Sequence, residues 1–340
     1  MKRTLLRYRI LIIVFSSLFI PLMFISLFRI EYSFIAPGFN DDISEFIVVN
    51  EDYNPSGSFH TTSVISVDKM TVLQFIVGML EDKVTIEEFP DYYKDVDLDD
   101  LDTMSYLMKD DSLATSLIIG IDSSGYEIDY DSYLSVYLVY NYLTPDSLKL
   151  GDKILKVNGR TDLVDAFNDI ACNETAEFKI LRKDEEMTVY AANNLLDNGT
   201  CKIGVYLSYI SEINSTVVEY TLVDTDTGGP SGGLMQSVYI YNQLTELNLG
   251  LGQKIAGTGT ISIDGSVGAI GGIKQKIITA DINNIDIFFV PYLSDDESDN
   301  YIEALRTYNT LDTDMVLVGV SSFQEVIDYL LALESGESNE

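Results

Sequence analysis

The chain has 340 residues, of which 54 are Asp or Glu and 21 are Lys or Arg, so its formal net charge is −33 at pH 7. This length allows two or three domains with a hydrophobic core, and 46% apolar residues argue against a disordered chain. Such an acidic chain argues against nucleic acid as a partner, because phosphate binding needs clustered Lys and Arg. One histidine, His60, and two cysteines exclude a multi-histidine or four-cysteine metal site. If the protein is an enzyme, its general base is therefore expected not to be histidine.

The amino-terminal segment is basic and apolar, in contrast to the acidic remainder. Residues 1–9 contain four basic residues and no acidic one, and residues 10–28 carry no charge before Arg29. A helix of about 20 apolar residues crosses a bilayer, and such helices tolerate a proline like Pro21. The positive-inside rule predicts a cytoplasmic basic tail over 1–9, a transmembrane anchor over 10–28 and an extracytoplasmic remainder.

Two other interpretations of this segment are weaker. A cleaved signal peptide has a shorter apolar region, and no A-x-A-like cleavage site follows here. A buried core helix leaves the basic residues at its start unexplained. Outside the cytoplasm, Cys172 and Cys201 can form a disulfide, although two free buried thiols fit the sequence equally well.

The region that follows the anchor, 30–132, mixes short apolar runs with acidic residues. The runs at 46–49 and 62–67 are typical of strands, and the apolar residues of 70–80 have helical spacing. This region is therefore expected to be folded and to contain both strands and a helix.

The stretch 81–111 is strongly acidic. Three alternate aspartates starting at Asp95 have the opening spacing of a calcium loop. Asp100, however, stands where that loop needs glycine, and Tyr106 stands where it needs glutamate. We expect this stretch to be a solvated acidic face or loop, and the sequence predicts no metal site and no cofactor.

Residues 133–195 have the pattern of a compact β-rich unit. A strand pattern at 136–140 precedes L-x-x-G-D-x-I-x-x-V-N-G at 148–159, which contains a turn, a short strand and an Asn-Gly hairpin signal. A short helix and two strands are predicted next, at 163–170, 177–182 and 187–190. The pattern at 148–159 resembles that of PDZ domains.

The resemblance to PDZ domains implies a peptide-binding groove between the strand at 136–140 and the helix at 163–170. Such grooves bind an extended peptide as an added strand, and the implied peptide-binding residues are Val136, Tyr137 and Leu138. The alternative is a small β domain that only packs against its neighbours.

Ser231 lies where a glycine-rich turn opens a helix. A strand pattern at 217–223 leads into Gly-Gly-Pro-Ser-Gly-Gly-Leu-Met at 228–235, and apolar residues at helical spacing follow over 234–247. Free N–H groups at a helix start favour negative charge, which suits a nucleophile whose reaction develops an oxyanion. The alternative is an ordinary turn with an N-cap serine. A phosphate-binding loop is excluded because the chain has no G-x-x-x-x-G-K-[ST] sequence.

The next segment, 254–276, contains a predicted hairpin around Asp264-Gly265 and then a Gly-Gly turn into a helix. Together with the turn at Ser231, it resembles the proteolytic domain of Lon proteases, whose motifs are G-P-S-A-G and G-x-[IL]-G-G-[IL]-x-x-K. The resemblance covers 203–334. It implies that Ser231 and Lys276 form a catalytic Ser-Lys dyad and that the hydroxyl of Thr258 supports it.

The order of anchor, PDZ-like unit and Lon-like domain resembles the PDZ-containing Lon-like membrane serine peptidases of Gram-positive-type bacteria. The short sequences at 36–38 and 57–62 also resemble the amino-terminal segment of that family. The predicted fold class is therefore an α/β (α+β) Lon-type proteolytic domain with a PDZ domain and an N-terminal transmembrane helix. The predicted parts are 1–9 basic tail, 10–28 anchor, 30–132 extracytoplasmic segment belonging to the protease body, 133–195 PDZ domain, 203–334 Lon-like domain and 335–340 flexible tail.

A Ser-Lys dyad agrees with the shortage of histidine. A lysine with a pKa of ~10.4 is charged at neutral pH and cannot act as a base, but burial lowers its pKa. Lys276 has uncharged neighbours and lies near a helix start, and both features favour the neutral amine. Lys274 is the competing base, and the family motif favours Lys276. One departure from the motif is Gly232, where the family usually has alanine. His60 is expected to be structural or at the surface.

These features predict a membrane-anchored, ATP-independent serine endopeptidase that cleaves extracytoplasmic peptides or exposed protein segments presented by the PDZ domain. Its partners would be its substrate and the membrane, and the resemblance also implies a homo-oligomer, since Lon-like domains often form rings. The alternatives are a non-catalytic PDZ peptide-binding adaptor on a Lon-like scaffold and a structural anchor of the cell envelope.

Overall fold

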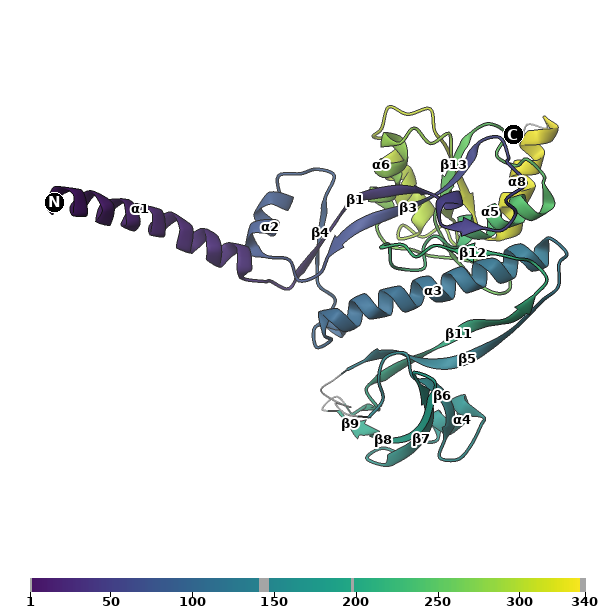
Figure 1. The fold of residues 1–340 in the computed structure, drawn as a ribbon, viewed down its shortest axis with the longest axis horizontal. Helices are drawn as coiled ribbons and strands as arrows, with labels where there is room; N and C mark the ends of the chain where they lie inside the picture. Colours follow the sequence, from purple (N-terminus) through teal and green to yellow (C-terminus); the bar gives the residue numbers. More distant parts are fainter. Residues whose placement is uncertain (1, 141–146, 197–198, 337–340) are drawn as a thin grey trace. The chain divides into compact units, whose positions relative to one another are not determined.

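A computed structural model of the protein is mixed α/β and describes residues 2–140, 147–196 and 199–336 (Figure 1). Most of the predicted carboxy-terminal tail, 337–340, and Met1 of the predicted basic tail lie outside the described residues.

The chain divides into two compact units, each made of two segments. Unit 1 comprises Met1–Gly38 and Val64–Lys94, and unit 2 comprises Phe39–Ser63 and Asp95–Glu340. Strands β1 (Tyr32–Asp42) and β3 (Ser58–Val67) each contribute residues to both units.

Unit 1 contains the long helix α1 (Lys2–Leu27), in which Tyr8–Leu27 is long and apolar enough to cross a membrane. The carbonyl of Phe28 accepts a hydrogen bond from the N–H of Val72, which begins the short helix α2 (Val72–Gly78). Thr71 and Gln74 cap α2 reciprocally, which explains why the helix starts two residues later than the sequence pattern predicts. The remaining elements of unit 1 are β4 (Thr85–Glu88), antiparallel to β1, and a 3-10 turn, η2 (Asp91–Tyr93).

Unit 2 has a parallel sheet in which β13 (Lys254–Gly257) lies between β3 and β16 (Ile287–Pro291), and β17 (Val316–Val320) pairs with β16. The hairpin predicted around Asp264-Gly265 joins β14 (Thr260–Ile261) to β15 (Val267–Gly268). Helices α5 (Gly233–Thr245), α6 (Ile273–Ile282), α7 (Asn300–Tyr308) and α8 (Phe323–Ser335) pack around these strands. A 3-10 turn, η1 (Ile43–Glu45), and the pair β2 (Ile47–Val48) and β12 (Thr221–Leu222) complete this part.

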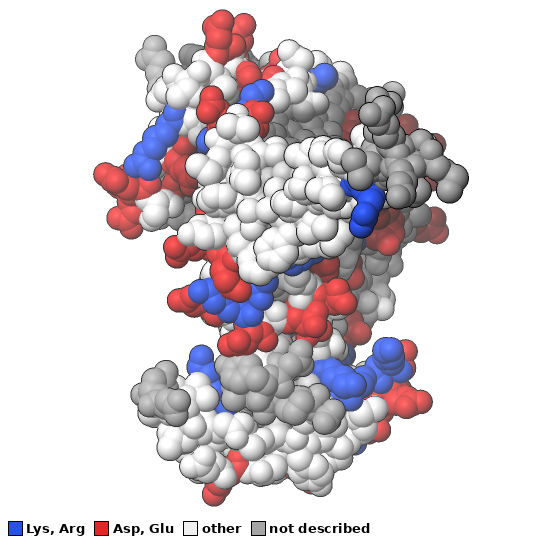
Figure 2. All heavy atoms as spheres, turned by 90° about the vertical axis from the view of Figure 1, so that its left-hand side faces the viewer, with Lys and Arg blue, Asp and Glu red and all other residues white. Residues whose placement is uncertain are grey.

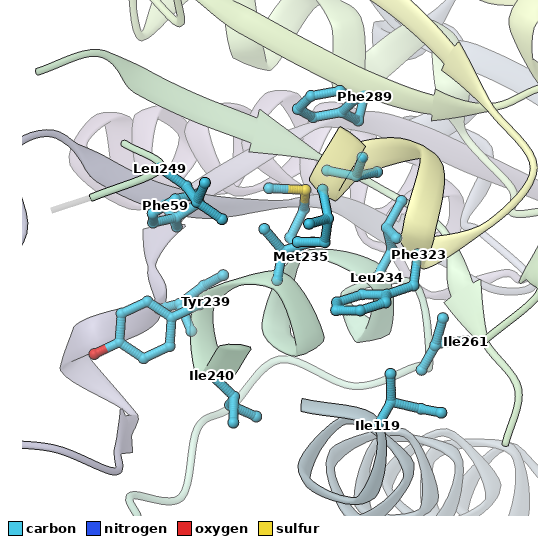
Figure 3. Close-up of a cluster of buried hydrophobic side chains, with 14 of the residues drawn as sticks. Phe59, Ile119, Leu234, Met235, Tyr239, Ile240, Leu249, Ile261, Phe289 and Phe323 are labelled. Atoms are coloured by element: carbon cyan, nitrogen blue, oxygen red, sulfur yellow. The ribbon is translucent and has the colours of Figure 1, made fainter. Parts of the chain in front are cut away.

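The main core of unit 2 surrounds α5 (Figure 3). Leu234, Met235 and Ile240 of α5 are fully buried. Figure 3 shows them between Phe59 and Phe289 of the sheet on one side and Ile119 on the other. Helix α5 is therefore held on both faces, which fixes the position of the turn that precedes it.

Helix α3 (Leu98–Ser123) differs from the expectation for the acidic stretch. The sequence predicts a solvated face or loop over 81–111, but from Leu98 onward this stretch is the start of a 26-residue helix capped by the Asp97 side chain. The sequence of α3 does not show apolar residues at regular helical spacing, because part of its buried face is not apolar. That face includes the small polar residues Ser112, Thr115 and Ser116, and also Gly120.

Gly120 lets α3 approach α5 closely. A Cβ built on residue 120 would lie 2.6 Å from both Cβ and Cγ2 of Ile240, which is well inside van der Waals contact. The two helices are therefore in contact at a point where only glycine fits.

A second sheet in unit 2 has the strand order β11-β5-β6-β7-β8. Its members are β5 (Ile128–Val139), β6 (Lys153–Val157), β7 (Thr175–Arg182), β8 (Glu185–Ala192) and β11 (Val205–Thr216), and α4 (Leu163–Asn168) packs on it. Asp152 is fully buried here, and its carboxylate accepts two hydrogen bonds from the Arg182 guanidinium at 2.7 Å. β5 and β11 pair along their whole length, and Figure 1 shows them beside α3.

Cys172 and Cys201 form a disulfide, which decides between the two alternatives that the sequence left open. Their Cα atoms are 5.7 Å apart, and the bond links the end of the second sheet to the short pair β9 (Asn194–Leu195) and β10 (Cys201–Lys202). In the chain-entropy account, a closed loop of this length stabilises the fold by roughly 3–4 kcal/mol.

The contact at Gly120 gives a stability prediction. Gly120→Ala should lower the free energy of unfolding by about 1–3 kcal/mol, because the added methyl group overpacks against Ile240. Urea denaturation of the detergent-solubilised protein measures this change. Ser123→Ala, at an exposed position of the same helix, is the matched control and should leave stability nearly unchanged. Equal stability of the Gly120→Ala protein would show that α3 and α5 can separate without cost.

Candidate active site

Ser231 lies in the turn before α5, and hydrogen bonds hold this turn from both ends. The carbonyl of Ser231 accepts hydrogen bonds from the N–H of Gly259 at 2.9 Å and from Oγ1 of Thr258 at 3.1 Å. The N–H of Leu234 donates to the carbonyl of Gly259 at 3.2 Å. The serine turn is therefore attached to the residues that follow β13.

Lys276 lies in the first turns of α6, and its side chain is only 2% exposed. Its Nζ is 2.7 Å from Oγ of Ser231, 3.1 Å from Oγ1 of Thr258 and 2.8 Å from the carbonyl oxygen of Thr62. The structure thus brings together Ser231, Lys276 and Thr258, the three residues singled out from the sequence, and it adds the backbone of Thr62.

Sheet register explains why Thr62 and Thr258 reach the same amine. β13 and β3 are parallel neighbours, and Gly257 pairs with Thr61. The next residues along the two strands, Thr258 and Thr62, therefore lie side by side at the carboxyl end of β13. Polar groups at the carboxyl ends of parallel strands commonly form ligand sites.

Burial lowers the pKa of the Lys276 amine to about 7, because desolvation disfavours the charged form. A neutral amine has two N–H groups and one lone pair. The carbonyl of Thr62 and the hydroxyl of Thr258 accept the two N–H groups, and Thr258 gives its own proton to the carbonyl of Ser231. The lone pair then faces the hydroxyl of Ser231, so the amine can accept the serine proton.

Backbone donors lie next to the serine hydroxyl. Gly232 precedes the first residue of α5, a helix of 13 residues. Among the hydrogen bonds between described residues, none uses the N–H of Ser231 or of Gly232. Free N–H groups at a helix start can stabilise an oxyanion that forms on a bound carbonyl.

One face of α3 holds the serine turn from the other side. Four residues at helical spacing contact the segment 224–233, at distances between 2.8 and 3.0 Å. Ser105 contacts Gly229 and Lys109 contacts Asp224. Ser112 contacts Pro230 and Ser116 contacts Gly233. The turn that carries the nucleophile candidate is therefore clamped between α3 and the sheet.

A cleft opens at Ser231 between these elements. Its walls come from the middle of β3, the glycine-rich turn and the middle of α3. Residues on these walls include Thr61, Ser63, Lys109, Gly228, Gly232 and Gln236. Ser231 is thus accessible from a surface cleft while its lysine partner is buried.

Other residues considered from the sequence lie elsewhere. Lys274 is partly exposed, whereas Lys276 is buried. His60 is 9% exposed and its ring nitrogens contact Asn40 at 3.0 Å and Ser58 at 2.8 Å, which is a structural role. Sequence reasoning missed the carbonyl of Thr62, whose only signal was the amino-terminal sequence at 57–62.

The predicted peptide-binding residues Val136, Tyr137 and Leu138 lie in β5, inside the second sheet, and their role in binding a peptide stays a prediction. These three residues are at most 5% exposed, and their strand pairs with β11 on one side. On the other side, the backbone of Val136 is hydrogen-bonded to Gly151 and Asp152. Among the described residues, β11 therefore occupies one side of this strand, and Gly151 and Asp152 occupy the other side at Val136.

Comparison with known protein families agrees with the geometry of this site. The family model of the Lon protease (S16) C-terminal proteolytic domain matches residues 223–333, which is about a third of the chain. A search of curated proteins found no match. Ser231, Thr258 and Lys276 lie inside the matched segment, whereas Thr62 and α3 lie outside it. Residues 223–333 are therefore similar to the proteolytic domain of a Lon-type serine protease.

Proposed function

We propose that the protein is a serine endopeptidase in which Ser231 is the nucleophile and Lys276 is the general base. The observation that carries this proposal is the 2.7 Å contact between Oγ of Ser231 and the buried Nζ of Lys276. Burial lowers the pKa of the amine to about 7, so a substantial fraction is neutral at that pH and the base requires no histidine.

The proposed reaction has two halves. Nζ of Lys276 takes the proton of Ser231 while Oγ attacks the peptide carbonyl, and the N–H groups of Ser231 and Gly232 stabilise the oxyanion. Lys276 then gives that proton to the leaving amine, and an acyl-enzyme remains. Lys276 then takes a proton from water, which attacks the ester carbonyl. As the bond to Oγ breaks, Lys276 returns that proton to Ser231 and the peptide acid leaves.

Thr258 and Thr62 are proposed to position the base. Both accept an N–H of the amine, so the lone pair is directed at Ser231 rather than free to rotate. Neither group carries a charge, so neither stabilises the protonated amine as a carboxylate would.

Three features support action at a membrane surface and outside the cytoplasm. Helix α1 is long and apolar enough to cross a bilayer, and the basic residues precede its apolar stretch. Next to its end, α2 and the following turn expose Val77, Met79 and Leu80, which suits contact with lipid. The disulfide between Cys172 and Cys201 is typical of oxidising compartments.

The acidic surface agrees with this location. Figure 2 shows Asp and Glu side chains spread over the face that it draws, with Lys and Arg in smaller groups. Such a surface repels anionic lipid headgroups and keeps the extracytoplasmic part in solution. The chain has no G-x-x-x-x-G-K-[ST] sequence, so we propose peptide hydrolysis without ATP.

We propose that the second sheet presents peptides along its edge strand, as the PDZ-like sequence pattern suggests. β11 is the edge strand, and its Tyr206 and Tyr209 are exposed. The N–H of Ser211 is already bonded to Asp111, so the open part of this edge lies before Ser211. An extended peptide can add there as a further strand.

Substitution of the dyad tests the peptidase function. Incubation with a mixed peptide library should show cleavage by the wild-type protein, and Ser231→Ala and Lys276→Ala should each lower kcat by roughly 10³-fold or more. Mass spectrometry of the products measures this. Lys274→Ala is the matched control and should keep its activity. A wild-type protein that cleaves nothing beyond what the two variants leave intact would favour a non-catalytic peptide-binding adaptor.

The pKa of Lys276 predicts a pH dependence. Because the neutral amine is the active form, kcat/KM should rise with pH, reach half its maximum at about pH 7 and level off above it. The unfolded state keeps this lysine protonated up to ~10.4, so the folded state binds fewer protons between these values. The contribution of Lys276 to stability should therefore rise with pH across that window and be least favourable below pH 7. A flat rate profile between pH 5.5 and 8.5, on the order of one unit either side of the pKa, would contradict a lysine base.

The absence of tryptophan gives a clean test of membrane contact. Phe19→Trp in α1 and Leu80→Trp after α2 should each be quenched by brominated lipid in reconstituted vesicles. Val316→Trp, at an exposed position of β17, should respond to iodide in the buffer instead. Quenching at position 19 alone would restrict the contact to α1, and quenching at neither position would contradict the anchor.

A further inference from the structure

The side chain of Gln236 reaches the cleft beside Ser231. Gln236 lies one turn after Gly232 on α5, and side chains on a helix lean towards its amino-terminal end. Gln236 is 8% exposed and lines the same cleft as Ser231 and Gly232. Its Oε1 lies 3.2 Å from Oγ of Ser116, on the side of the amide that faces α3.

The other end of this amide faces the start of the helix. A Cβ built on residue 232 would lie 2.7 Å from Nε2 of Gln236 and 3.1 Å from Cγ2 of Thr61. Any residue other than glycine at 232 would therefore displace the amide. Gly232, the departure from the Lon motif noted in the sequence, leaves open the space that Nε2 uses.

Nε2 has no acceptor within the described part of the chain. None of the hydrogen bonds between described residues uses this group as a donor. Nε2 is not fully enclosed but open to the cleft, where water or a bound carbonyl can accept its N–H. The cleft beside Ser231 is where a substrate carbonyl would lie.

We propose that Nε2 of Gln236 donates a hydrogen bond to the oxyanion, as a third donor beside the N–H groups of Ser231 and Gly232. This inference rests on the proposed peptidase function. When Oγ of Ser231 bonds to the carbonyl carbon, the carbonyl π electrons move onto its oxygen, and Nε2–H stabilises that charge without forming a covalent bond. The bond strengthens only as charge develops, so it affects kcat more than KM.

The test compares Gln236→Met with wild type, using the full chain in detergent and a fluorogenic peptide that wild type cleaves. Methionine keeps the length of the side chain and removes the donor. kcat should fall by roughly 10²- to 10³-fold while KM changes by less than about threefold. Gln243→Met, which removes a buried amide on the same helix away from the cleft, is the matched control and should keep its kcat.

Two further measurements separate donation from packing. Gly232→Ala should lower kcat when Gln236 is present. In a Gln236→Ala protein the colliding amide is gone, so adding Gly232→Ala should lower kcat only slightly further. The affinity of a peptide boronic acid, which forms a tetrahedral adduct with a serine hydroxyl, should fall in parallel with kcat. Thermal unfolding of each variant shows whether it is folded.

The outcomes are distinguishable. A Gln236→Met protein with wild-type kcat, or with a raised KM alone, overturns the role of Gln236 and leaves the peptidase function standing. A wild-type protein that neither cleaves the library nor binds the boronic acid overturns the peptidase function and this role with it.

Discussion

The proposed chemistry depends on one buried amine that has no counter-ion among the described residues. Lys276 is almost fully enclosed, and desolvation is the cause of its lowered pKa. A carboxylate beside it would favour the charged form and remove its basicity. In a chain with 54 acidic residues, this amine instead contacts two hydroxyls and one backbone carbonyl. The sheet register that places Thr62 beside Thr258 therefore matters as much as the lysine itself.

Helix α3 shows how an acidic segment can contribute to such a neutral site. Its two sides have different compositions: Asp99, Asp102 and Asp110 are exposed to solvent, whereas serines and Gly120 face α5 and the serine turn. Small side chains allow close approach, and their hydroxyls satisfy carbonyls of the turn. The helix thus fixes the backbone of Ser231 without bringing a carboxylate to the lysine.

Much of the site could be predicted from the sequence because its side chains lie in two dense local patterns around Ser231 and Lys276. Their meeting with Thr258 follows from those patterns. Thr62 could not be found in this way, because it contributes a backbone carbonyl, which every residue has. Helix α3 was missed because its buried serines do not produce apolar periodicity. The pairing of the strand at Val136 with β11 could not be predicted, because β11 is about 70 residues away along the chain and such pairing leaves no local signal.

The pairing of β5 with β11 has a consequence for how this chain is built. Ile128, where β5 begins, and Thr216, where β11 ends, are direct partners across the two strands. The chain segment between them therefore begins and ends at the same place. Adjacent ends are the condition under which a whole domain can be inserted into another without disturbing it. The segment between them, which contains the β-rich part, is thus joined to the rest of unit 2 at one place, and a short turn joining 128 to 216 would close the chain without it. Under the proposed function, the residues that present a peptide and those that cleave it would belong to separable stretches of one polypeptide.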